Sequence, residues 1–444
     1  METHASAAND SPAGSSLKRQ VGVAGATMMG LGSIIGTGVF VSIGIAAGVA
    51  GPAVVLAIAL AAVVATCNGL SSAQLAANHP VSGGTYEYGY RWLTPSLGFT
   101  AGWMFLCAKS ASAATAALGC AAYLLHTVGR DPADWLVPLA ILVVVILTLL
   151  VLSGIRRSSA TNIVIVTITL VALVVFILAG LPSALTALTA NLTPFFQPPA
   201  DGSPVAGLLE ACALMFVAYT GYGRIATLAE EVHSPRRTIP LAIIFTLGVS
   251  MLLYVAVGLV GVAAVGAEAF ATSGAGGAAP LEAVAQQFEI PAVSEIVAVG
   301  AVTAMLGVLL NLILGLSRVV LAMSRRKEMP VLFTRVGGES ATPYPAVLLV
   351  GVIIGLLVLV GNVKTTWSFS AFTVLVYYAI TNLAAIRLTP EERLYPRIFP
   401  WTGLVACLFL AFWVERRIWL VGLGLIAAGL VWHLVANQLR RRAP

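Results

Sequence analysis

Two glycine clusters interrupt long apolar stretches of the sequence, and their spacing is the first sign of chemistry. The first reads GLGSIIGTGVF (30–40), and the second is the YTGYG of 219–223. Glycine costs about 1 kcal/mol per residue in a helix interior, so each cluster predicts a helix that unwinds midway. An unwound helix offers free N–H groups to a carboxylate and free C=O groups to an ammonium. Two such breaks are suited to hold the backbone of an amino acid without any charged side chain.

Close packing of helices through small residues is the alternative explanation for either cluster. Two clusters at corresponding positions favour binding, because unwound backbone at membrane depth persists only where it lines a cavity or binds something.

Three cations stand inside apolar stretches, where charge is expensive and usually functional: Lys109, Arg224 and Arg318. Lys109 shares a helix face with small and polar residues, so its ammonium should point into the protein. Arg224 is a candidate for an inner gate, and Arg318 is expected to snorkel or to pair with Glu230 or Glu231. The apolar stretches contain no nucleophile, paired carboxylates or metal-ligand cluster, which argues against an enzyme, and no cofactor or metal is indicated.

Composition places these residues in a membrane protein. Of the 444 residues 59% are hydrophobic and only 9% charged, with a mean hydropathy of +0.96, which excludes a water-soluble core. The chain is predicted to be an all-α polytopic protein with about twelve transmembrane helices. Their expected ranges are 20–48, 52–77, 96–126, 135–153, 160–181, 206–229, 239–265, 293–324, 343–361, 366–387, 400–414 and 417–437.

Lys and Arg residues predict the orientation. With an even number of helices and the N-terminus inside, seventeen of them fall in cytoplasmic segments and four in outer ones (Arg130, Lys364, Arg416 and Arg417). Both termini are therefore expected in the cytoplasm, and the net charge of +6 reflects topology and not a nucleic-acid surface. The five cysteines all lie in apolar spans without CxxC pairing and are expected to be packing residues.

The positions of the two broken helices, first and sixth in order, predict a pair of inverted repeats with a binding site between them. The expected organisation is a disordered cytoplasmic tail (1–17), a first repeat (18–182), an extracellular loop (183–205), a second repeat (206–388) and two further helices with a short basic cytoplasmic C-terminus (389–444). The tail has no basic region before an apolar core and does not look like a cleaved signal.

Four motifs resemble the amino acid, polyamine and organocation (APC) transporter superfamily, over about residues 18–388. GSIIGTGVF resembles the signature of its first helix, PVSGGTYEYGY (80–90) that of the loop after helix 2, and FVAYTGYGRIATLAEEVHSPRRTIPLAI (216–243) that of helices 6 and 7. SRVVLAMSRRKEMP (317–330) is similar to the end of its eighth helix. The resemblance implies a LeuT-like five-plus-five fold with two extra helices, and secondary active transport of amino acids in the cytoplasmic membrane.

The resemblance also implies the binding residues. The substrate carboxylate would meet N–H groups around Gly36, Thr37 and Gly38, near Ser33. The amino group would meet carbonyl groups; these belong to Ile34, Val217, Ala218 and Thr220.

The sequence departs from the family at three positions that bear on mechanism. Thr169 stands where many proton-coupled or exchanging members carry a helix 5 lysine, and it is either a sodium ligand or an innocuous threonine bonded to its own helix. Val217 replaces a gating aromatic, so the site is expected to be closed less tightly from outside, or to be closed by Phe216 or Tyr219 instead. Gln74 stands where a glutamate is often found near the end of helix 2, which removes one proton-carrying candidate.

Lys109 lies next to a position where some cationic amino acid transporters carry a glutamate. It would repel a basic substrate, so neutral or acidic amino acids are expected. Two other roles stay open for Lys109: a titratable cation that links transport to protons, or a structural lysine paired with a carbonyl.

The expected function is thus an ion-coupled symporter or exchanger of amino acids. The alternative is an amino acid sensor, or transceptor, that binds without net transport. The amino acid, proton or sodium coupling, and the oligomeric state are left open by the sequence.

Overall fold

The computed structural model describes residues 21–80, 83–154, 159–196, 203–227, 232–272, 279–337 and 342–442. Within these ranges the protein is all-helical and contains two isolated β-bridges but no strand. The predicted tail 1–17 and the acids Glu230 and Glu231, expected near Arg318, lie outside the described residues.

The helices occur in the following order. The first half of the chain forms α1 (Val23–Ile34), η1 (Gly38–Ser42), α2 (Ile43–Ala50), η2 (Gly51–Ala53), α3 (Val54–Asn78), α4 (Thr85–Trp92), α5 (Pro95–Thr127), α6 (Pro132–Leu152) and α7 (Ser159–Leu192). The second half forms α8 (Pro204–Tyr219), η3 (Thr220–Tyr222), α9 (Gly223–Thr227), α10 (Pro235–Val265), α11 (Ala267–Thr272), α12 (Pro280–Ala285), η5 (Gln286–Phe288), α13 (Val293–Arg325), η6 (Val331–Thr334), α14 (Tyr344–Val358), α15 (Val363–Ile386), α16 (Ile398–Ala411) and α17 (Arg416–Arg442).

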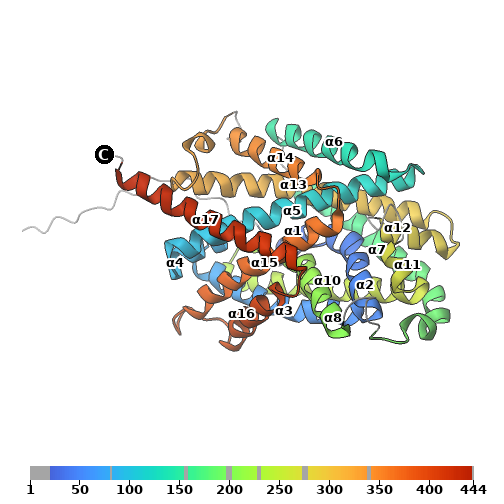
Figure 1. The fold of residues 1–444 in the computed structure, drawn as a ribbon. Coiled ribbons are helices and arrows are strands. Elements are labelled where there is room, and N and C mark those ends of the chain that lie inside the picture. The colour runs from blue at the N-terminus through green and yellow to red at the C-terminus, as the bar shows by residue number, and fades with distance from the viewer. Residues whose placement is uncertain are drawn as a thin grey trace, which may run out of the picture.

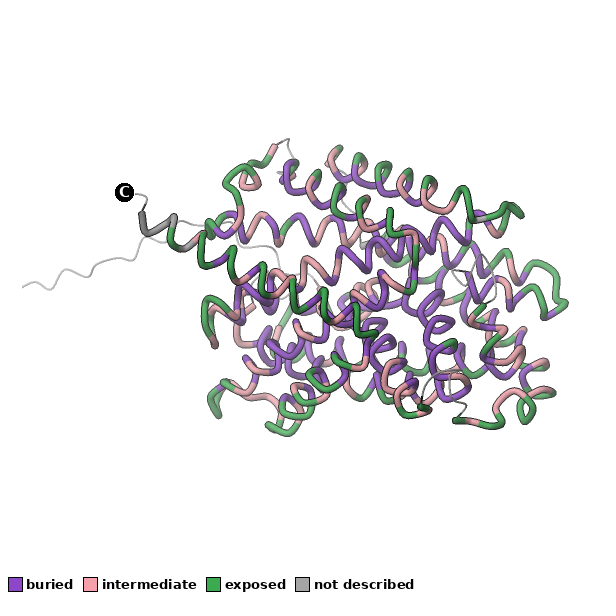
Figure 2. The backbone as a smooth tube through the Cα atoms, in the orientation of Figure 1, coloured by how far each residue is buried: buried purple, intermediate pink, exposed green. Residues whose placement is uncertain are grey.

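The helices have the length and surface of a polytopic membrane protein. Nine helical stretches among the described residues are long and apolar enough to cross a membrane, and α1, α14 and α16 are shorter apolar helices. Their outer surfaces are apolar as well: Leu142, Ile146 and Leu149 of α6 are each at least 52% exposed. Figure 2 shows the buried residues gathered in the interior of the bundle, with exposed positions along the outer helices. Such an apolar exterior suits lipid and not water.

Two helix ends differ by five residues or more from those expected. α7 continues to Leu192, so the first ten residues of the predicted 183–205 loop are helical. Pro182 lies inside α7 and does not end it, because a proline removes only one backbone hydrogen bond and membrane helices tolerate this loss. The last helix, α17, likewise runs five residues beyond its expected end.

The bundle has two distinct ends. α5 packs against α13 and α15 at the centre, while α10 packs against α3 and α7. Figure 1 shows α4 and the C-terminal end of α17 at one end of the molecule and α11 and α12 at the other.

Candidate functional site

The chain breaks its helices where the glycine clusters predict. α1 ends at Ile34, the next residue Ile35 is extended (φ −78°, ψ 107°), and the helix resumes through the π-helical turn η1. α8 ends at Tyr219, and the 3₁₀ turn η3 separates it from α9. The first N–H groups of a resumed helix and the last C=O groups of an interrupted one lack partners within their own helix. Both breaks therefore present the polar groups that the sequence predicts.

The two breaks lie directly against each other. A Cβ atom on Gly221 would stand 2.2 Å from the carbonyl oxygen of Ser33 and 2.6 Å from the nitrogen of Ile34, so only glycine permits this contact. A Cβ on Gly38 would stand 2.7 Å from that of Ala218. Tyr254 of α10 joins the breaks from behind, since its hydroxyl lies 2.8 Å from the Ile34 carbonyl oxygen and 3.4 Å from that of Ala218.

A cavity of about 40 Å³ lies between the breaks. Seven of the eight predicted substrate-binding residues line it: Ser33, Ile34, Thr37, Gly38, Val217, Ala218 and Thr220. The eighth, Gly36, is not among the lining residues, because its Cα faces Val308 of α13, where an added Cβ would meet Cγ2 at 2.6 Å. The hydroxyl of Thr37 is buried and has no hydrogen-bond partner among the described residues. Such an orphan group in a cavity wall is a ready partner for a polar ligand.

Lys109 reaches the same cavity from α5. Its ammonium donates to the Thr220 hydroxyl at 2.9 Å, and that hydroxyl donates to the Val217 carbonyl at 2.8 Å. The side chain thus points into the bundle, as its helix face predicts. Its bond is to a hydroxyl and not to the backbone carbonyl of the structural alternative. Among the described residues no carboxylate lies within salt-bridge distance of it. Lys109 is half-buried, and a cation with so little water and no counter-charge would be stabilised by an anionic group of a ligand.

A larger cavity of about 240 Å³ continues from this point toward the end of the bundle that carries α4. It shares Ser33, Lys109, Thr220 and Gly221 with the small cavity. The charged residues among its described lining are Lys109, Arg224 and Arg318, all of them basic. The candidate inner-gate residue Arg224 therefore lies on the path between the small cavity and that end.

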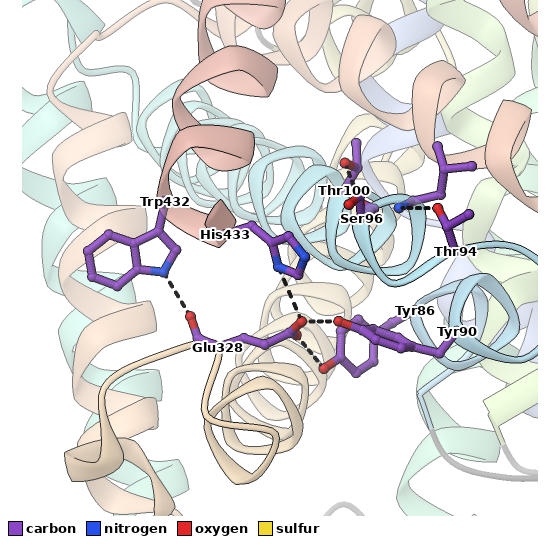
Figure 3. A network of polar contacts seen from close by, with 9 residues as sticks. Tyr86, Tyr90, Thr94, Ser96, Thr100, Glu328, Trp432 and His433 are labelled. Atoms are coloured by element: carbon purple, nitrogen blue, oxygen red, sulfur yellow. Dashed lines mark hydrogen bonds and ion pairs between the residues drawn. The ribbon is translucent and has the colours of Figure 1, made fainter. Parts of the chain in front are cut away.

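The wall of the larger cavity is tied together by a buried carboxylate. Figure 3 shows Glu328, which follows α13, surrounded by side chains from two other helices. The Tyr86 hydroxyl donates to it at 2.6 Å, Tyr90 donates to its other oxygen, and His433 Nδ1 lies 3.6 Å away. Trp432 Nε1 donates to the Glu328 backbone carbonyl at 2.8 Å. This network joins α4, the end of α13 and α17.

The remaining predicted residues lie outside both cavities. Thr169 of α7 is buried and donates to the Ile165 carbonyl at 2.8 Å, the local bond of the innocuous alternative. Phe216 packs edge-on against Tyr378, and Tyr219 lies against Tyr254. Neither is a lining residue of the cavities described here, so the gating hypothesis gains no direct support from their placement.

Two aromatic residues of the site have no signal in the sequence motifs. Trp367 of α15 lines the small cavity and donates through Nε1 to the Leu214 carbonyl at 3.0 Å. Tyr254 is the bridge between the breaks. Both belong to helices that are far in sequence from the first break. In the sequence, only the indole N–H and the phenol hydroxyl within apolar stretches distinguish them from packing residues.

Val217 forms part of the wall of the small cavity, so a larger side chain at this position should reduce the volume of the cavity. Replacing it by Phe should fill part of the cavity, so binding of leucine should weaken about tenfold more than that of alanine. Competition binding to the purified protein measures this ratio, with Val308→Ile as a control on another wall. An equal loss for both amino acids would mean that Val217 is only a packing residue.

Comparison with known proteins agrees with this geometry. The chain matches the amino acid permease family over residues 25–434. An uncharacterized transporter of Mycobacterium tuberculosis is 37% identical over 427 residues, which cover 96% of this chain and 93% of the relative. The branched-chain amino acid permease of Bacillus subtilis is 28% identical over 442 residues (95% and 92%), and the methylthioribose transporter of the same organism is 27% identical over 450 residues (95% and 94%). The family is one of transporters and not of enzymes, and this chain belongs to the amino acid permease family.

Proposed function

We propose that the protein is a secondary active transporter that moves neutral or acidic amino acids by alternating access, as an ion-coupled symporter or an exchanger. The observation that carries the proposal is the contact of the two broken segments around one small cavity. A bound amino acid would place its carboxylate at the N–H groups of the resumed first helix, near Thr37 and Gly38. Its ammonium would meet the carbonyls of Ile34, Val217 and Ala218.

The proposal includes a membrane arrangement. We infer twelve transmembrane helices, with two inverted repeats of five that cover about 18–182 and 206–388, followed by two further helices. The protein would lie in the cytoplasmic membrane, with both termini in the cytoplasm. The larger cavity would then open toward the cytoplasm, because α4 and the basic residues after α13 lie at that end. The short helices α11 and α12 would lie outside.

The side-chain selectivity follows from the walls of the small cavity. Ile34, Val217 and Leu312 form apolar walls, which suit an aliphatic side chain, whereas Lys109 disfavours a basic one. The descriptions of the two Bacillus subtilis relatives name branched-chain amino acids and methylthioribose, and an aliphatic substrate agrees with the branched-chain amino acid permease. A lysine in this wall also leaves room for an acidic side chain as its counter-charge.

Uptake into proteoliposomes tests the proposal most directly. A panel of labelled amino acids, measured with and without a proton or sodium gradient, should show saturable uptake of neutral or acidic amino acids and none of arginine, lysine or polyamines. Binding of an amino acid without uptake or exchange would favour the sensor alternative. Failure to bind any amino acid would overturn both.

A further inference from the structure

A buried carboxylate links α12 to the end of α5, in the part of the protein that we assign to the outside of the membrane. Glu282 of α12 is only 2% exposed. One of its oxygens lies 3.2 Å from His126 Nδ1 and accepts from the Thr127 hydroxyl at 3.0 Å, both at the end of α5. Its other oxygen is buried and has no hydrogen-bond partner among the described residues. The carboxylate therefore fastens α12 to α5 but is itself incompletely satisfied.

This fastening extends to the candidate site. Tyr123, one turn before His126, donates to the Phe40 carbonyl of η1 at 2.7 Å, and its hydroxyl is close enough to Glu282 to feel the charge of that carboxylate. The start of α12 also covers α2, where a Cβ on Gly44 would stand 2.8 Å from a ring atom of Pro280. The lid formed by α11 and α12 thus rests on η1 and α2, the resumed half of the first broken helix.

The charges that face this pair are few. Glu295 at the start of α13 acts on Glu282 with the same sign, and α11 carries the exposed Glu268. The segments η1, η5 and α7 contribute no titratable side chain, and the arginines of α10 lie at its opposite end. Burial raises the pKa of the Glu282 carboxyl, and His126 and Thr127 act in the opposite direction.

If α11 and α12 open to water and close again during transport, closure changes the number of bound protons. In water near pH 7 a glutamate is ionised and an imidazole is mostly neutral, so an exposed pair carries about one negative charge. A buried pair is stable when it is neutral overall, either as carboxylate with imidazolium or as carboxylic acid with imidazole. Both arrangements contain one proton more than the exposed pair. By linkage, closure takes up a proton and is favoured as the outer pH falls.

Building on the proposed transport function, we propose that the Glu282–His126 pair is the proton-binding site that couples outer lid closure, and hence inward transport, to an external proton. Glu282 carries the coupling, because it must be neutralised whenever the lid buries it. His126 lowers the pKa of the Glu282 carboxyl and so shifts the pH at which this happens. Substrate in the small cavity and the proton at Glu282 would favour the same closed conformation through Tyr123 and η1.

The test measures proton movement together with substrate movement in proteoliposomes. Wild-type protein should take up substrate several-fold faster with pH 5.5 outside than with pH 7.5, and an internal pH dye should report close to one proton per substrate. Glu282→Gln should abolish this acid stimulation and the proton signal, while exchange of labelled for unlabelled substrate stays measurable. His126→Gln should retain proton movement with a shifted pH dependence, because the carboxyl alone still titrates.

Matched controls separate this coupling from a structural latch. Glu295→Gln removes a nearby exposed carboxylate and should leave the pH response of the wild type. Glu282→Asp restores a titratable group and should recover proton movement if Glu282→Gln is poorly folded. Acid-stimulated uptake that persists in Glu282→Gln, or is lost in His126→Gln and Glu282→Gln alike, would overturn the coupling role. A wild-type protein that neither binds nor transports amino acids would instead overturn the proposed function.

Discussion

A Gly221→Ala variant should lose amino acid binding at least a hundredfold, which corresponds to about 2.8 kcal/mol. The added Cβ would stand 2.2 Å from the Ser33 carbonyl oxygen and 2.6 Å from the Ile34 nitrogen. Both are backbone atoms, which cannot rotate away as a side chain can. The two broken segments would have to separate, so the N–H groups of one and the carbonyl groups of the other would no longer face the same ligand. Isothermal titration with the best substrate of the uptake panel measures the loss. Gly38→Val should have a similar effect, because the valine side chain would clash with Ala218, whose Cβ lies 2.7 Å from the position of the added Cβ.

A control glycine shows whether the loss of binding is specific to the contact between the two breaks. Gly315 lines the larger cavity in α13 and has no atom within 4 Å of an added Cβ, so Gly315→Ala should bind substrate within about twofold of the wild type. Size-exclusion profiles of all three variants report whether the bundle is intact. If Gly221→Ala is folded and binds normally, the contact of the breaks does not form the binding site.

Replacing Lys109 by Gln should admit arginine, which the wild-type protein should exclude. Lys109 lines the small cavity in which we propose that the substrate binds, so a second cation there would meet a like charge at low dielectric. Arginine binding should improve at least tenfold in Lys109→Gln, glutamate binding should weaken by a similar factor, and alanine binding should change little. The glutamine amide can still donate to the Thr220 hydroxyl, which preserves the local hydrogen bond that Lys109→Ala removes.

The pH profile of the same variants distinguishes the roles open for Lys109. Uptake of glutamate, alanine and arginine across pH 5 to 8 should keep its acid stimulation in Lys109→Gln if the external proton is carried by Glu282. Loss of that stimulation would transfer the coupling role to Lys109. Unchanged selectivity and pH dependence would leave Lys109 a structural residue. Ser110, the neighbour of Lys109 on α5, offers Ser110→Ala as a control.

Local chemistry alone determined much of the candidate site. The glycines of 30–40 and 219–223 break their helices in the structure because the cost of glycine in a helix is paid at the residue itself. Lys109 faces inward because the period of an α-helix fixes which residues share its face. The membrane class follows from composition, which is independent of the fold.

Other features depended on contacts between distant parts of the chain. Gly36 lies outside the small cavity because the unwound turn directs it toward Val308, and the exact direction of an unwound turn is set by what packs against it. Thr169 donates to a carbonyl of its own helix. Its correspondence to the helix 5 lysine of other family members did not reveal this local bond.

The clearest contrast is between the two buried carboxylates and the glycine breaks. Glu328 meets tyrosines of α4 and a histidine of α17, more than a hundred residues away on either side, and Glu282 meets His126 from 156 residues earlier. A sequence reveals that such groups can ionise, but their partners are chosen by the packing of whole helices. The sequence by itself thus determined where the two helices are interrupted, because that depends on local free energy. Only the tertiary structure decided which charges are buried together, because burial and pairing belong to the assembled bundle.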